Sequence, residues 1–210
     1  MAYSRNILVV RLSALGDILI SVPLVKAYAA ANPKVLFTLL YAPVTEGFFK
    51  GIENVRFIPD PLKKEKAGVA KVIKFARRIS KEAKEQGTPI TMVADIHDVL
   101  RTKVLRTWYK VNGIKCASID KGRSERKALT REKNKVFAPI KSSMRKYEEV
   151  FVKLGLKDLN VSSAQGEIKR LSPSPYRKIG IAPFTAEKGK QWPLEYVEES
   201  IRILSADPNN

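Results

Sequence analysis

A polar loop directly follows the first apolar run of the chain. Ile7–Val10 is typical of a buried strand, and the loop after it reads Arg-Leu-Ser-Ala-Leu-Gly-Asp, ending at Asp17. Ligands of open α/β sheets bind at the carboxyl ends of strands, so this loop is a candidate site. Gly16 would permit a tight turn and close approach of a ligand, and Asp17 could act as a general base on a substrate hydroxyl. Alternatively, Asp17 only caps the following helix, and spacing alone favours that interpretation.

A second polar stretch, Asp95-Ile-His-Asp98, follows the fourth predicted strand. His97 is the only histidine of the chain, so a cluster of histidine ligands is excluded. Asp95 and Asp98 could hold a divalent cation, but a turn satisfied by its own carboxylates is the commoner arrangement, and we expect no metal. Arg101 could instead clamp an anion with its guanidinium group.

A third stretch, Gly180–Pro193, joins an apolar run to a predicted helix that begins with proline. Thr185 and Lys190 lie in the connecting loop, and backbone N–H groups at a helix start suit a diphosphate. The alternative is an ordinary strand-to-helix connection with exposed lysines. Neither G-x-G-x-x-G nor a Walker loop occurs, so the usual dinucleotide and P-loop motifs are absent.

Alternating apolar runs and helical spacings predict the elements that position these loops. The predicted strands cover residues 6–12, 35–41, 55–59, 90–94, 114–119 and 178–183. The first predicted helix follows the first loop and ends at residue 31. The other predicted helices cover residues 44–50, 66–86, 99–109, 143–154 and 193–204. Pro23 predicts a kink in the first helix, or a restart near Ser21. Residues 121–135 are strongly basic and are predicted as a loop or a mobile helix.

This order predicts an α/β fold, a Rossmann-like doubly wound parallel sheet. Residues 1–160 would form that domain, residues 161–176 a linker, and residues 177–210 the incomplete start of a second Rossmann-like domain. One strand and one helix are too little to bury a core, which is why the second domain is expected to be incomplete.

The charge of the chain is strongly positive and unevenly spread. Its 210 residues carry 39 Lys+Arg and 21 Asp+Glu, a net charge of +18, and residues 63–160 hold 26 basic and 11 acidic residues, or +15. Such clustering indicates an anionic partner, for which nucleic acid, anionic lipid head groups and phosphorylated sugars all qualify. The alternative is a solvated helix face.

Composition narrows the class of protein. The sequence has 11 glycines, 12 prolines and one cysteine, and this composition excludes collagen-like, mucin-like and disulfide-stapled chains. Because a single cysteine cannot form an internal disulfide, a reducing compartment is favoured. No apolar run reaches the ~20 residues of a membrane-spanning helix. We expect a cytoplasmic protein, with a peripheral position on the inner face of the inner membrane left open.

These stretches together resemble glycosyltransferase family 9, the bacterial lipopolysaccharide heptosyltransferases. Ile7–Leu19 followed by Pro23 is similar to the N-terminal motif of that family, and Gly180–Pro193 to the start of its nucleotide-sugar domain. The segment from Asp95 and the helix Tyr147–Leu156 match more weakly. The resemblance covers essentially the whole chain in order.

The resemblance implies two Rossmann-like domains in the GT-B arrangement, with no metal or other cofactor. It implies transfer of a sugar, typically heptose from ADP-heptose, to a lipopolysaccharide core with inversion. Asp17 matches the catalytic base, Ser13 and Gly16 match the loop that shapes the active-site floor, and Thr185 and Lys190 match contacts to the donor phosphates. Ala186 stands where many relatives carry Thr or Ser.

The acceptor side would be lined by Arg101, His97 and the helix within residues 63–84. An anionic glycolipid acceptor, the lipopolysaccharide core, would explain the basic middle of the chain. Relatives continue well beyond position 210 with the ribose and base contacts, so this polypeptide alone is not expected to be a competent transferase. The competing hypothesis is a basic binding module for anionic membrane or nucleic acid without catalysis. Nucleic acid is disfavoured because the basic stretches lack interleaved aromatic residues.

Overall fold

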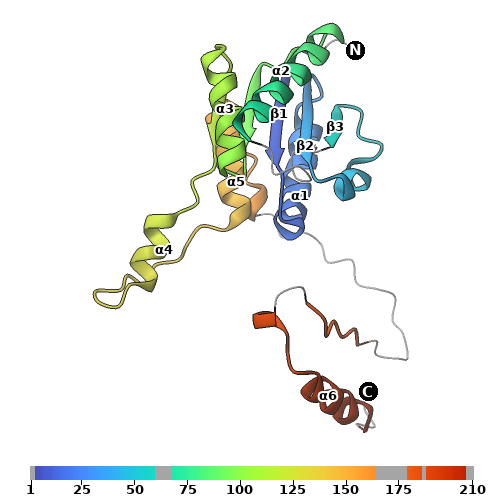
Figure 1. Ribbon diagram of the computed structural model, residues 1–210, viewed down its shortest axis with the longest axis vertical. Coiled ribbons are helices and arrows are strands. Elements are labelled where there is room, and N and C mark those ends of the chain that lie inside the picture. The colour runs from blue at the N-terminus through green and yellow to red at the C-terminus, as the bar shows by residue number, and fades with distance from the viewer. Residues whose placement is uncertain (1–2, 60–67, 164–178, 186–187, 207–210) are drawn as a thin grey trace. The chain divides into compact units, whose positions relative to one another are not determined.

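A computed structural model describes residues 3–59, 68–163, 179–185 and 188–206 (Figure 1). The chain divides into two compact units, residues 1–164 and residues 165–210.

The first unit is built on a five-stranded parallel sheet with the order β3-β2-β1-β4-β5. The strands are β1 (Arg5–Arg11), β2 (Val35–Tyr41), β3 (Val55–Pro59), β4 (Met92–Asp95) and β5 (Lys115–Ser118). The strand order reverses at β1, which starts both halves of the sheet. The predicted doubly wound Rossmann-like sheet is therefore confirmed, and β1 and β4 flank the switch point where ligands of such sheets bind.

Helices cover both faces of this sheet. They are α1 (Leu15–Ala31), α2 (Val69–Glu85), α3 (Leu100–Val111) and α5 (Ser143–Lys153), and a 3-10 helix η1 (Pro43–Phe49) follows β2. The side chains of β1 alternate between two cores: Ile7 and Val9 pack with α1 and α5, whereas Leu8 and Val10 pack with α2 and α3. A strand buried on both faces needs this continuous apolar run.

Helix α1 continues through Pro23 without the predicted restart near Ser21. Proline at this position removes one N–H donor and crowds the carbonyl four residues earlier. Ser21 is fully buried; its hydroxyl donates to the Ile18 carbonyl at 2.7 Å and contacts the Tyr41 hydroxyl at 2.9 Å. Packing of this face against β2 holds the helix in one piece.

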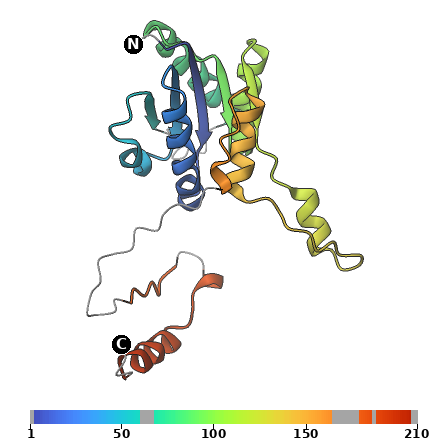
Figure 2. The same cartoon turned by 180° about the vertical axis from the view of Figure 1, so that it is seen from behind.

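Between β5 and α5 the chain leaves the body of the unit. Figures 1 and 2 show helix α4 (Arg123–Thr130) and the loop after it projecting beyond α3 and α5. The stretch predicted as a loop or a mobile helix therefore contains eight helical residues, and none of them is buried.

In the second unit the structure describes η3 (Lys188–Lys190) and α6 (Leu194–Ala206). The predicted helix over 193–204 is confirmed. The predicted strand over 178–183 is wrong for residues 179–183, which adopt no regular structure, and Lys178 lies outside the described residues. A strand needs a neighbour to complete its hydrogen bonds, and the described residues of this unit offer none.

Candidate functional site

The loop after β1 brings Arg11 and Asp17 together. The carboxylate Oδ2 of Asp17 lies 2.5 Å from Nη2 of Arg11, while Nη1 of Arg11 donates to the Ile96 carbonyl at 2.7 Å. The side chain of Arg11 is 9% exposed and that of Asp17 is 42% exposed. One guanidinium thus ties the loop to the end of β4 and holds a solvent-accessible carboxylate at the switch point.

Asp17 is the third residue of α1, in its first turn, and the helix is preceded by Ala14 with no side-chain cap. The interpretation of Asp17 as the helix cap is therefore wrong, because its carboxylate turns to Arg11 instead. Gly16 is also helical rather than part of a tight turn. Nothing lies within 4 Å of the space that a side chain at Gly16 would occupy, which leaves room above the first turn of the helix.

Helix α5 supplies an aromatic wall beside this pair. The Arg11 guanidinium carbon lies 5.5 Å from the centre of the Tyr147 ring. Burial raises the pKa of the Tyr147 phenol, and Arg11 opposes that rise. Nε of Arg11 is buried without a hydrogen-bond partner among the described residues. The ring and the guanidinium together form a rigid back wall for the carboxylate.

A cavity of about 390 Å³ opens in front of Asp17. Its walls come from the end of β1, the segment after β5, helix α4 and the start of α5. Five of its lining side chains are cationic and one is acidic; the complete lining is Arg11, Asp17, Ile119, Lys121, Arg126, Ile140, Lys141, Ser143, Lys146 and Tyr147. Such a cavity favours an anion in its interior and places a single carboxylate beside it.

His97 lies on the other side of the loop and is 7% exposed. Its Nδ1 accepts from the Leu12 N–H at 3.4 Å, and its Nε2 lies 3.4 Å from the Ser13 hydroxyl, so a proton on Nε2 satisfies both contacts. The pKa of His97 is lowered to about 4, mainly by burial and in addition by the nearby cations Arg11, Lys121 and Arg101, whereas Asp17 opposes them. The ring is therefore neutral at pH 7 and supports the backbone of the loop that carries Ser13.

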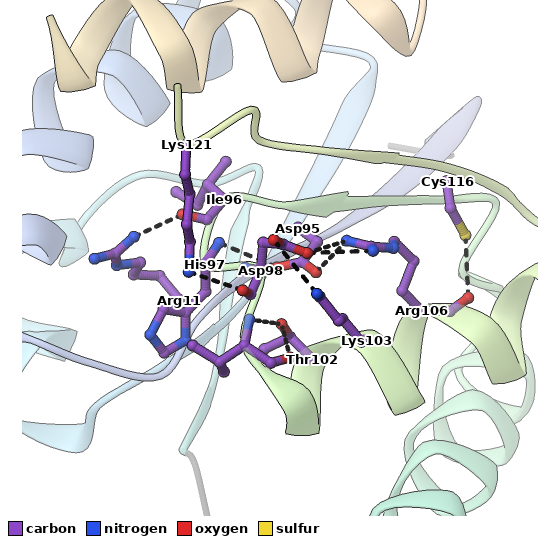
Figure 3. A network of polar contacts seen from close by, with 11 residues as sticks. Arg11, Asp95, Ile96, His97, Asp98, Thr102, Lys103, Arg106, Cys116 and Lys121 are labelled. Carbon is purple, nitrogen blue, oxygen red and sulfur yellow. Dashed lines mark hydrogen bonds and ion pairs between the residues drawn. The ribbon is translucent and has the colours of Figure 1, made fainter. Parts of the chain in front are cut away.

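The two acids near His97 are already engaged (Figure 3). Arg106 donates to Asp95 at 2.7 Å and to Asp98 at 3.3 Å. Asp95 also accepts from the backbone N–H groups of His97 and Asp98, and burial raises its pKa. Lys121 donates to the Asp98 carbonyl at 2.8 Å, which ties the wall of the cavity to this network. Among the described residues, no group of three or more His, Cys, Asp or Glu side chains could hold a metal ion.

None of the remaining predicted residues of the first unit lines this cavity. Arg101 is half-buried in the first turn of α3, and neither it nor His97 lines the cavity. Helix α2 packs on the opposite face of the sheet. Thr185 and Lys190 are exposed and belong to the second unit.

Sequence reasoning missed most of the cavity lining. Lys121, Arg126, Lys141 and Lys146 lie in the basic region 63–160, whose sequence indicates charge but no site, and Tyr147 lies in a predicted helix. A signal existed, because residues 120–121 follow the carboxyl end of a predicted strand, where ligands of open sheets bind.

No family model and no curated protein matches the sequence. Solved structures do match. E. coli heptosyltransferase WaaC with ADP-2-deoxy-2-fluoro heptose matches with a TM-score of 0.58 and 21% identity, over 96% of this chain and 66% of WaaC. WaaC with ADP gives a TM-score of 0.54 at 19% identity, over 96% of this chain and 63% of WaaC. The glycosyl transferase family 9 structure from Veillonella parvula DSM 2008 gives 0.50 at 16% identity, over 75% of this chain and 44% of that one. This chain has the family 9 glycosyltransferase fold.

The chain spans less than two thirds of the length of each of these family 9 structures. At 16–21% identity the likeness establishes the fold. The family 9 fold expected from the sequence is thus confirmed over most of the chain. The roles of individual side chains follow from their own geometry. No described helix of this family 9 fold is long and apolar enough to cross a membrane.

Proposed function

We propose that this chain is the acceptor-binding part of an inverting glycosyltransferase of the heptosyltransferase type. The observation that carries the proposal is the position of Asp17, an accessible carboxylate held by Arg11 at the mouth of a cationic cavity. A sugar acceptor with anionic groups suits that cavity, and its hydroxyl would then lie beside a base. The likeness to WaaC, which was solved with ADP and with an ADP-heptose analogue, supports a nucleotide-diphosphate sugar as donor.

In the proposed reaction, the acceptor hydroxyl oxygen attacks the anomeric carbon of the donor sugar. The bond from that carbon to the diphosphate oxygen breaks, and the nucleoside diphosphate leaves with the electron pair. Asp17 takes the proton of the attacking hydroxyl, a role that general bases fill within hydrogen-bond reach of the proton. Attack opposite the leaving group inverts the anomeric carbon. In this scheme Thr185 and Lys190 contact the donor phosphates, and the lysine offsets the charge that develops on the departing diphosphate.

Arg11 serves this scheme as a positioning residue. A guanidinium that is nine-tenths buried and fixed to the Ile96 carbonyl leaves the Asp17 carboxylate few orientations. Ser13 and Gly16 form the floor in the proposed scheme: Ser13 through its contact with His97, and Gly16 by leaving open space beside the carboxylate. We propose that the acceptor is an anionic glycolipid such as a lipopolysaccharide core, and that no metal or other cofactor takes part.

Substitution of Asp17 by Asn tests the role of the base. Asp17→Asn is expected to lower kcat for transfer from ADP-heptose by about 10²–10⁴-fold, the usual contribution of a general base. The matched control is Glu46→Gln, which removes an exposed acid outside the cavity. Circular dichroism checks that both variants fold. Turnover by Asp17→Asn at the rate of the control would refute the assignment of the base.

Acceptor binding by the 210-residue chain tests the cavity separately. A phosphorylated core oligosaccharide is expected to bind tighter than its dephosphorylated form, and Lys146→Gln is expected to reduce that difference, since Lys146 lines the cavity with its side chain only 10% exposed. Equal binding of both oligosaccharides would contradict an anionic acceptor.

A further inference from the structure

We propose that the projecting segment between β5 and α5 docks the protein on an anionic lipid surface. This segment, residues 121–142, is called the basic arm. It runs out along α4, turns, and returns to α5 in both views of the molecule (Figures 1 and 2). Binding to vesicles requires neither a sugar donor nor enzymatic turnover, so this inference is tested separately from the proposed function.

The basic arm is exposed over most of its length. No residue of α4 is buried, and residues 131–139 are all exposed. Its tip is nevertheless ordered by local hydrogen bonds: the Val136 N–H donates to the Ala128 carbonyl at 3.0 Å, and the Arg131 side chain donates to the Asn134 carbonyl at 2.5 Å. An ordered projection with almost no buried surface gains little from folding onto the rest of its own chain, which indicates a partner outside it.

The charge of the basic arm selects an anionic partner. It holds eight Lys or Arg residues and two Glu residues, a net charge of +6 in 22 residues. Six of these cations are exposed and form no ion pair within the described residues, and two of the six, Arg126 and Arg131, donate to backbone carbonyls. The other four are Arg123, Lys127, Lys133 and Lys135. Lysine and arginine side chains near an anionic bilayer each strengthen binding, and clusters of four to eight are typical of lipid-binding segments.

The apolar residues of the tip select a membrane over nucleic acid. Phe137 is 83% exposed and Val136 is 48% exposed, and Ala138 and Pro139 continue the apolar run. Large apolar side chains next to unpaired cations are typical of segments that lie at the boundary between head groups and acyl chains. Nucleic acid would instead require several aromatic residues as stacking platforms, and Phe137 is the only one in the arm.

The basic arm also begins beside the candidate site. Its first residues and its last lie in the cavity wall, where Lys121, Arg126 and Lys141 contribute side chains. Its outer residues, including Lys133, Lys135 and Phe137, are not part of that lining. The tip can therefore be altered without touching the cavity.

The experiment measures binding of the 210-residue chain to vesicles by co-sedimentation. Vesicles of phosphatidylcholine with phosphatidylglycerol are compared with phosphatidylcholine alone at about 0.1 M ionic strength, where the Debye length is about 10 Å. The double variant Lys133→Glu and Lys135→Glu is expected to weaken binding to the anionic vesicles by about tenfold or more. The matched control, Lys74→Glu and Arg77→Glu on the exposed face of α2, changes net charge equally and is expected to weaken it less than about threefold.

A third variant, Phe137→Ser, tests insertion of the tip. It keeps every charge and is expected to weaken vesicle binding severalfold, because a phenyl group buried in the bilayer boundary contributes through its apolar area. All substituted side chains are exposed, and circular dichroism verifies that each variant folds. Equal losses in the tip and α2 variants would overturn the proposal, since binding would then follow net charge alone. No effect of Phe137→Ser, together with tighter binding to single-stranded nucleic acid than to vesicles, would overturn it in favour of a nucleic-acid surface.

Discussion

The Arg11 guanidinium makes two contacts, one through each of its terminal nitrogen atoms. Nη1 anchors it to the end of β4, and Nη2 holds Asp17. His97 adds a second anchor, because its neutral ring accepts from the loop at Leu12. The loop after β1 thus depends on a histidine that must stay unprotonated.

The stability of the first unit is therefore expected to depend on pH through His97. Its pKa is about 4 in the folded chain against an ordinary value of 6.5, so the unfolded chain binds the proton more readily. Stability from this group is complete above about pH 6.5 and is lost as pH falls toward about 4, by up to about 3 kcal/mol. Urea unfolding at a series of pH values measures it.

His97→Gln is the matched variant for that measurement. The difference in unfolding free energy between the original chain and the variant isolates His97 from Asp95, whose raised pKa acts in the opposite direction. If the difference stays constant between pH 4 and pH 7, the neutral buried histidine is ruled out.

Among the elements, α1 and α5 pack against each other and cover the face of the sheet on which the cavity opens. Phe151 is fully buried and stacks on Tyr28 with ring centres 4.7 Å apart, and Tyr28 donates to the Lys157 carbonyl at 3.0 Å. Phe151→Ala is expected to cost about 3–5 kcal/mol of unfolding free energy, as for other buried aromatic truncations. Phe48→Ala, at a 44% exposed position, is the control and is expected to cost less than about 0.5 kcal/mol. Equal losses in chemical denaturation would contradict this packing.

Gly122, the second residue of the basic arm, directly precedes α4 and is the second element-scale test. Its φ is +59°, and a Cβ there would lie 2.6 Å from Nζ of Lys146. Gly122→Ala is expected to cost roughly 1–2 kcal/mol from the left-handed backbone, and to displace Lys146 from the cavity wall. Gly47→Ala, where nothing lies within 4 Å, serves as the control. If Gly122→Ala leaves both the unfolding free energy and the binding of the phosphorylated oligosaccharide unchanged, the expected strain and the displacement of Lys146 are contradicted.

The strands and helices of the first unit could be predicted because their apolar runs are continuous or regularly spaced. Ile7–Val10 identifies β1, and the spacing of three and four in α2 matches its buried Val72, Ala76 and Ile79. The same apolar criterion failed at residues 179–183, because a run becomes a strand only beside another strand.

The cavity could not be predicted, since it joins segments separated by about a hundred residues. The spacing of Arg11 and Asp17 gives no indication that Tyr147 lies behind them. The sequence also does not indicate the partner of Asp95, because Arg106 lies eleven residues later, on the following helix. Local patterns locate elements, whereas side-chain partners across elements depend on how the layers pack.

At the scale of the whole molecule, the net charge of +18 makes stability sensitive to salt. Repulsion among like charges opposes the compact state and is screened as ionic strength rises. We expect the Tm to rise by a few degrees between about 0.01 M and 0.2 M sodium chloride. Differential scanning calorimetry measures this. A Tm that falls with salt would show that the ion pairs at Arg106 and Arg145 outweigh the repulsion.

The proposed docking of the basic arm on a bilayer would have a kinetic consequence. An enzyme tethered at a bilayer meets lipid-linked acceptors by diffusion in two dimensions, so its rate follows the mole fraction of acceptor in the membrane and not the bulk concentration. Diluting the acceptor with inert phospholipid would then slow transfer, even though the total amount of acceptor stayed the same. The distance from the tip at Phe137 to the carboxylate of Asp17 would then determine how far above the lipid head groups an acceptor sugar must lie to receive the transferred sugar.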